Sequence, residues 1–107
     1  MKGKLLDADF IMQRINHRRR LVHLHSVLYY HLHTPIVSDM QFDIWSQDLV
    51  NLNRIHPWTL TFGYEPQLFC DWTGDTGMHL PVTNWAYDMG MRMRERARAL
   101  KFDMHAA

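Results

Sequence analysis

The sequence is poor in cysteine, proline and glycine. Only Cys70, four prolines and five glycines occur among its 107 residues. A single cysteine excludes a disulfide framework and a zinc site built on cysteine pairs, and it is typical of a reducing compartment. The sequence also lacks the run of roughly 20 apolar residues of a membrane helix, and the apolar segment of a signal peptide. We therefore expect a cytoplasmic protein without a membrane partner.

A strong excess of charge of either sign is also missing. The formal net charge is +1 with neutral histidines, so no global field draws the protein toward nucleic acid. Any such binding must be local, and a solvated basic face is the alternative explanation for a basic run. The candidates for nucleic-acid contact are Arg92, Arg94, Arg96 and Arg98.

Eight histidines raise the question of a metal site, above all in two His-Leu-His motifs. On a helix, residues i and i+2 point about 200° apart, so neither His23 with His25 nor His31 with His33 can share one metal ion. We expect no metal. A catalytic residue is not expected either, because Cys70 lies beside Asp71, whose charge disfavours a reactive thiolate.

What the sequence does contain is 47% hydrophobic residues, enough for the core of one domain over residues 1–107. Helical periodicity predicts a first helix from near Asp7 or Asp9 to about His33. Arg19, Arg20, His23 and His31 are predicted to point away from its buried face. The residues predicted on that face are Phe10, Leu21, Val22, Leu28, Tyr29 and Leu32.

A second helix is predicted from Asp39 to about Ile55. Pro35 breaks the first helix, and "SDMQ" is typical of a capping box in which the Ser38 side chain accepts from the amide of Gln41. The sequence "HP" at 56–57 ends the helix. The short connection makes the two helices antiparallel neighbours. The predicted apolar face of the second helix comprises Phe42, Trp45, Leu49 and Leu52.

The remaining chain is predicted to cover this hairpin. Residues 58–81 are too rich in glycine and proline for more than a short strand pair, and their aromatic residues favour packing over the hairpin. A last helix is predicted from about Asn84 to Lys101, with Trp85, Met89, Met93, Ala97 and Leu100 on its apolar arc. The expected fold is all-α, with a hairpin over about 7–57 and an irregular segment plus C-terminal helix over 58–107.

The stretch "YYHLHTPIVSDMQFD" places aromatic and acidic side chains around the turn of the hairpin. Asp39 and Asp43 are four residues apart with Phe42 beside them, while Tyr29 and Tyr30 end the partner helix. Aromatic faces and carboxylates together suit a planar cation, and a carboxylate can also accept from ribose hydroxyls. The nicotinamide riboside half of NAD⁺ is such a ligand. From periodicity alone, core packing is the simpler explanation for Tyr29, and a first-turn acid for Asp39.

The segment "VLYYHLHTPIVSDMQFDIWSQDLVNLNRIHP" resembles the small N-terminal domain, called Ia, of bacterial NAD⁺-dependent DNA ligases. That domain has a Tyr-Tyr or Tyr-His pair, a proline turn, "SDAEYD" and a leucine-rich helix ending in His-Pro. The resemblance covers roughly residues 14–57. It implies that Tyr29 and Phe42 match the aromatic pair around the nicotinamide ring. It also implies that Tyr30, Asp39 and Asp43 match the other contacts to ring, ribose or phosphate.

The sequence departs from the ligases in two ways. Phe42 replaces a tyrosine of the family, which keeps a stacking surface and removes a hydroxyl. The Lys-x-Asp-Gly motif of the nucleotidyltransferase domain is echoed only by "KFDM" at Lys101–Met104, without the glycine. Small stand-alone proteins resembling the Ia domain occur in bacteriophages, and "CDWTGDTGMHLP" looks like part of their second half.

Two functions follow as expectations. The first is a module that binds nicotinamide mononucleotide or NAD⁺ and is no enzyme on its own, at most a non-catalytic part of a ligase system with a separate nucleotidyltransferase subunit. The second is an interaction protein, phage-encoded and host-directed, that reuses the hairpin as a scaffold and binds a protein or nucleic acid through its arginine helix.

Overall fold

The computed structural model describes residues 2–106, with side chains described from residue 7 to residue 100. Its elements in chain order are α1 (Lys2–Tyr30), α2 (Asp39–Ile55), the 3-10 helix η1 (Pro57–Thr61), α3 (Pro66–Phe69) and α4 (Asn84–Ala106). No strand occurs among residues 2–106, so the all-α fold class is confirmed and the short strand pair is wrong. Two short helices occupy its place.

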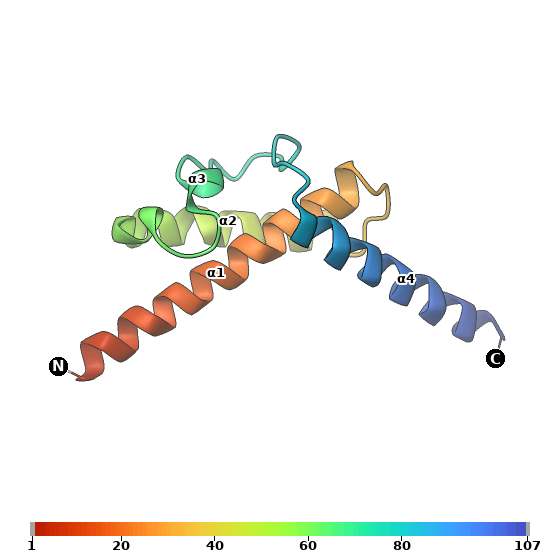
Figure 1. The fold of residues 1–107 in the computed structure, drawn as a ribbon, viewed down its shortest axis with the longest axis horizontal. Coiled ribbons are helices and arrows are strands. Elements are labelled where there is room, and N and C mark those ends of the chain that lie inside the picture. Colours follow the sequence, from red (N-terminus) through yellow and green to blue (C-terminus); the bar gives the residue numbers. More distant parts are fainter. Residues whose placement is uncertain (1, 107) are drawn as a thin grey trace.

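The two longest helices set the shape of the molecule. Figure 1 shows α1 and α4 meeting near the middle and diverging toward opposite ends, while α2 runs back along α1. The segment between α2 and α4 passes over the hairpin, and the longest dimension is 56 Å. None of the described helices is long and apolar enough to cross a lipid bilayer.

Local signals place both ends of α2 where the sequence predicts them. The Ser38 hydroxyl accepts from the amide of Gln41 at 3.1 Å, which satisfies one of the free amides of the first turn. At the other end the amide of His56 donates to the carbonyl of Leu52 at 2.9 Å, and Pro57 starts η1. The predicted range Asp39–Ile55 is confirmed.

The predicted ends of α1 are both displaced. The helix begins at Lys2, so Asp7 and Asp9 lie within it and cap nothing. It ends at Tyr30, before the residues that Pro35 constrains. The reason is a tight local exit: His33 adopts a left-handed conformation with φ 52°, and the amide of Leu32 donates to the carbonyl of Val27 at 2.9 Å.

The middle of α1 is buried on all sides, which a one-sided amphipathic interpretation misses. Every residue from Val22 to Leu28 is buried. The cause is that α2, the 58–81 segment and α4 surround this part of the helix. Phe10 and Tyr29, predicted on the buried face, lie beyond this surrounded part and are 68% and 47% exposed.

Arg19 and His23 were predicted to point away from the core, and the structure shows both fully buried. Arg19 donates to three backbone carbonyls, those of Thr59 at 2.9 Å, Phe62 at 2.6 Å and Tyr64 at 3.1 Å. Burial lowers the pKa of Arg19. The two terminal nitrogens of the guanidinium therefore join α1 to the chain that follows α2, while its Nε is buried without a partner among the described residues.

His23 lies one turn further along α1. One ring nitrogen is 2.8 Å from the Tyr64 hydroxyl, and the other is 2.8 Å from the carbonyl of Pro81. Burial raises the pKa of Tyr64 to about 12, with the neighbouring Glu65 charge acting in the same direction. The Arg20 guanidinium lies 5.1 Å from the centre of the Tyr64 ring. Arg20 and His31 are both exposed, as the sequence predicts.

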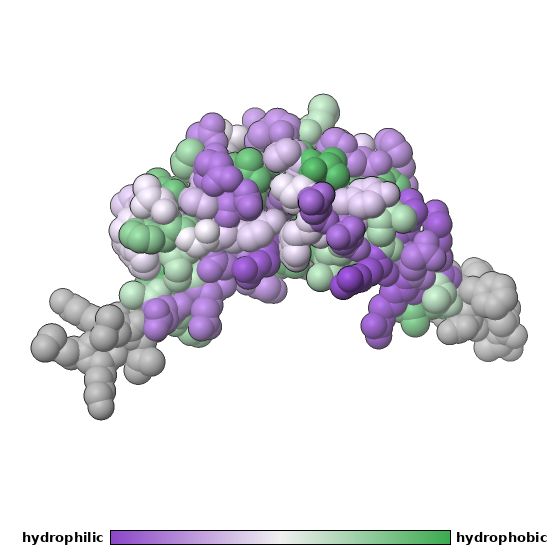
Figure 2. Space-filling model, viewed as in Figure 1, coloured by the Kyte–Doolittle hydropathy of each residue, from purple (hydrophilic) through white to green (hydrophobic). Residues whose placement is uncertain are grey.

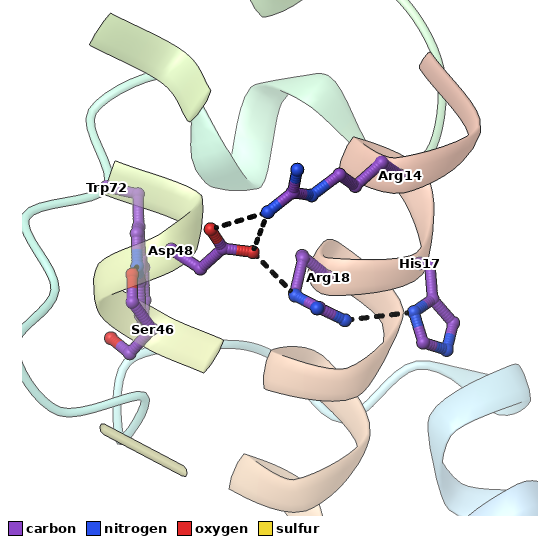
Figure 3. Close-up of polar contacts among 6 residues, drawn as sticks. All are labelled: Arg14, His17, Arg18, Ser46, Asp48 and Trp72. Atoms are coloured by element: carbon purple, nitrogen blue, oxygen red, sulfur yellow. Dashed lines mark hydrogen bonds and ion pairs between the residues drawn. The ribbon is translucent and has the colours of Figure 1, made fainter. Parts of the chain in front are cut away.

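The 58–81 segment packs over the hairpin as predicted. Phe69, Trp72 and Leu80 enter one core cluster with residues of α1 and α2 such as Ile15 and Leu49. The Trp72 indole nitrogen donates to the backbone carbonyl of Ser46 at 3.1 Å, and Figure 3 shows the indole alongside α2. The two earlier aromatic residues, Trp58 and Phe62, remain 45% and 58% exposed.

An ion-pair cluster joins the outer faces of α1 and α2. The Asp48 carboxylate accepts from Arg18 at 2.7 Å and from Arg14 at 3.2 Å, and the Arg18 guanidinium also donates to Nδ1 of His17 at 3.1 Å (Figure 3). These side chains are partly exposed, so the pairs position the helices more than they stabilise them.

α4 packs on α1 through small residues. Ala86 and Gly90 are buried, and a Cβ on Gly90 would lie 2.8 Å from a methyl group of Leu32. The close approach explains why a glycine lies in this helix interior. The residues of the predicted apolar arc are half-buried from Trp85 to Ala97, whereas Leu100, the last of them, is 57% exposed.

Candidate functional site

A cavity of about 390 Å³ opens where α1 ends and α2 begins. The turn between the two helices and the loop 74–76 complete its lining. In Figure 1 this is the region where the chain leaves α1 and returns into α2. All five residues predicted from the sequence line this cavity: Tyr29, Tyr30, Asp39, Phe42 and Asp43.

Two neighbouring tyrosines supply the aromatic surface at the end of α1. The rings of Tyr29 and Tyr30 meet edge to face, with centroids 4.8 Å apart and planes at 71°. Tyr29 is 47% exposed, so the explanation that it fills the core is wrong. Phe42 faces the same cavity from the first turns of α2 and is half-buried. Aromatic surface from both helices is therefore accessible to a bound molecule.

Carboxylates surround this aromatic surface. Asp39 and Asp43 lie one turn apart on α2, and Asp75 lines the cavity from the loop 74–76. All three are exposed, and none takes part in an ion pair within the part of the chain whose side chains are described. The lining contains no lysine or arginine. The local charge therefore favours a cationic ligand.

Sequence reasoning missed several lining residues. His25 is only 4% exposed, lines the cavity, and packs its ring on Trp45 with centroids 5.2 Å apart. Its Nδ1 is buried without a hydrogen-bond partner among the described residues. Desolvation lowers the pKa of His25, so the imidazole is neutral near pH 7. The His-Leu-His motif drew attention to this residue only as a metal ligand.

The loop 74–76 was also missed, because it begins 36 residues after the end of the turn at Ser38 and carries no local signal for contact with it. Where side chains are described, no group of three histidine, cysteine, aspartate or glutamate residues is placed to hold a metal ion. The exposed Cys70 lies outside the cavity lining.

The arginine run of α4 is separate from this cavity. Arg92, Arg96 and Arg98 are exposed, Arg94 is half-buried, and Arg98 pairs with Glu95 at 3.7 Å. Figure 2 shows strongly hydrophilic side chains gathered over this helix. Arg92 and Arg96 share one side with Met89 and Met93, where they line a shallow depression.

Comparison with known proteins assigns residues 8–62 to a family. The family described as "DNA ligase-like, N-terminal NAD⁺-binding domain" matches residues 8–62 of the 107. The chain belongs to this family. The matched range is longer than the resemblance seen over 14–57. It contains the five cavity residues that the sequence analysis predicted as contacts of the cofactor.

A curated relative agrees with the family. The DNA ligase of Carboxydothermus hydrogenoformans is 32% identical to the ligase-like domain over 56 residues, which is 52% of this chain and 8% of that ligase. The matched part is therefore a small portion of the relative. No solved structure matches the chain.

Proposed function

We propose that this ligase-like domain binds the nicotinamide mononucleotide half of NAD⁺ in the cavity between α1, α2 and the loop 74–76. The observation that carries the proposal is the joint presence of accessible aromatic rings and unpaired carboxylates in one cavity of about 390 Å³. A pyridinium ring is flat and positively charged, so it gains from stacking and from nearby negative charge.

Each cavity residue has a role in this proposal. Tyr29 and Phe42, from different helices, offer the faces against which the ring stacks, and Tyr30 supports Tyr29 edge to face. Asp39 and Asp43 are acceptors for ribose hydroxyls and balance the ring charge. Because Phe42 has no hydroxyl, hydrogen bonding to the ribose falls on the carboxylates.

The charge of the lining favours the nicotinamide half of NAD⁺ over the adenylate half. A phosphate is bound in proteins by basic side chains or free amides, and the lining contains neither lysine nor arginine. Three carboxylates would repel an anion. The phosphate of the mononucleotide therefore projects out of the cavity, where a second protein can reach it.

Catalysis is not part of the proposed role. No lysine lines the cavity to attack a phosphorus atom, so the domain holds the cofactor and any nucleotidyl transfer is performed elsewhere, by a nucleotidyltransferase domain. In this view the domain is a non-catalytic part of a ligase-like system.

Calorimetric titration with nicotinamide mononucleotide, NAD⁺ and AMP tests the proposal. Binding of the first two but not of AMP is expected, and Asp43→Ala should weaken it by about 1.5 to 3 kcal/mol, the range for a hydrogen bond to a charged group. Asp88→Ala removes an exposed acid of α4 outside the cavity and serves as the control. Absence of binding to all three by the folded protein would refute the proposal.

A second candidate function uses α4. The three exposed arginines on a projecting helix favour contact with nucleic-acid phosphates. Arg92 and Arg96 share one side, so the double variant Arg92→Gln/Arg96→Gln is expected to weaken DNA binding and flatten its salt dependence. Binding that is undetectable at low salt, or insensitive to salt, would remove this candidate.

A further inference from the structure

Part of the cavity wall comes from outside the region that matches the ligase family. The match ends at residue 62, whereas Gly74, Asp75 and Thr76 line the cavity together with the family residues. Residues beyond the matched region therefore complete the wall of the cavity. The chemistry of that wall can set which ligands the cavity accepts.

The wall is fixed in place on both sides of Asp75. Before it, the Trp72 indole donates to the carbonyl of Ser46, and Gly74 adopts φ 82° in close contact with α2. After it, Gly77 packs directly on the Ser26 hydroxyl of α1. Asp75 and Thr76 thus lie between two anchors on the two hairpin helices, and the position of the carboxylate is built into the fold.

His25 supplies a second feature that the proposed stacking and ribose contacts do not use. His25 is only 4% exposed and lines the cavity. Its Nδ1 has no hydrogen-bond partner among the described residues. Buried polar nitrogens are nearly always paired in native proteins, so the unpaired Nδ1 shows that no hydrogen bond of the fold uses this nitrogen of a ring that lines the cavity. A neutral imidazole offers one donor and one acceptor.

We propose that the cavity selects the oxidised, amide-bearing nicotinamide ring, with His25 contacting the carboxamide and Asp75 adding a carboxylate that favours the positive ring. The carboxamide also offers a donor and an acceptor, so it complements the imidazole. A nicotinate carboxylate lacks the donor and is repelled by the cavity acids, and a reduced ring has lost the charge. This inference rests on the proposed function.

The first experiment is a calorimetric comparison of three ligands on the full chain. Nicotinamide mononucleotide is expected to bind about 10-fold or more tighter than nicotinic acid mononucleotide, because a site that hydrogen-bonds an amide discriminates against its analogue. It is also expected to bind tighter than its reduced form. Equal affinity for the amide and the acid would overturn the inference while leaving the proposed function intact.

Two variants assign the preferences to residues. His25→Leu should reduce the preference for amide over acid by about 10-fold, whereas His31→Leu, an exposed histidine outside the cavity, should not. Asp75→Asn should weaken nicotinamide mononucleotide about 3-fold, as for an exposed ion pair, with the reduced form unaffected. Asp71→Asn, an exposed acid of the same segment outside the cavity, is its control.

Folding is checked for each variant by circular dichroism. If His25→Leu fails to fold, His25→Phe replaces it, and the same loss of preference is expected because a phenyl ring has neither a donor nor an acceptor. Unchanged ligand preferences in the folded His25 and Asp75 variants would overturn the inference. If the parent chain binds none of the three ligands, the proposed function fails, and the inference fails with it.

Discussion

Replacing Arg19 by methionine tests how the second half of the molecule is held on the first. Arg19 is fully buried, and its guanidinium donates to the carbonyls of Thr59, Phe62 and Tyr64 at 2.9, 2.6 and 3.1 Å. Methionine keeps most of the apolar stem and removes all of these donors. The carbonyls beyond α2 then lose their link to α1.

The expected loss follows from the surroundings of each bond. A hydrogen bond with one charged partner contributes about 1.5 to 3 kcal/mol, so three fully buried ones would sum to about 5 to 9 kcal/mol. Only the bond to Thr59 is buried, and water can replace the donor at the other two carbonyls. Methionine also avoids the desolvation of a charge. We expect a net loss of about 3 kcal/mol in the free energy of unfolding.

Urea unfolding followed by far-ultraviolet circular dichroism measures this loss. With a typical slope of about 1.5 kcal/mol per molar urea, the midpoint should fall by about 2 M. Arg20→Met is the matched control, because Arg20 is exposed and only lies over the Tyr64 ring, a contact worth about 1 kcal/mol at most. The reasoning is refuted if both variants unfold at the same urea concentration.

Three further predictions concern stability. Gly77→Ala should destabilise the fold by about 1 to 3 kcal/mol in the same urea assay, because the new methyl group would overlap the buried Ser26 hydroxyl. Asp48→Asn should lower the free energy of unfolding by less than about 1 kcal/mol, and high salt should remove the difference from the parent. Because burial lowers the pKa of His25 below its ordinary 6.5, the unfolded chain binds the proton more readily. Stability should therefore fall as the pH drops below 6.5. Thermal melts of His25→Gln should show a smaller fall, because the variant lacks this imidazole; an equal fall would contradict the reasoning.

Elements with signals in adjacent residues were predictable. The Ser38 cap and the His56-Pro57 stop define α2, since capping and proline geometry act within one helical turn. The turn chemistry also brought Tyr29, Tyr30 and the α2 acids to one place, because a short connection leaves two helices few relative arrangements. The candidate site follows largely from these local rules.

Features that depend on distant partners were not predictable. The residues near Arg19 in the sequence do not indicate that its guanidinium donates to carbonyls about 40 residues away. Because charged residues are usually exposed, the sequence analysis therefore placed Arg19 on the surface, whereas it is buried. The same holds for α1 between Val22 and Leu28, where three separate segments remove any exposed face. Hydrophobic periodicity identifies a helix with one buried face and one exposed face. A helix that is buried on all sides has no exposed face, so periodicity cannot identify it.

The lining of the cavity comes from both halves of the chain. The family region supplies the aromatic rings and two acids, while the segment beyond residue 62 supplies Asp75 and the anchors that hold it. If the segment 58–81 only covered hydrophobic surface, Trp72 and Leu80 in the core would be sufficient. That role does not require the Asp75 carboxylate at the cavity, between Gly74 and Gly77, which pack on the hairpin helices. Loop 74–76 therefore lies against the proposed ligand site, so a bound nicotinamide ring would meet residues from both halves of the chain.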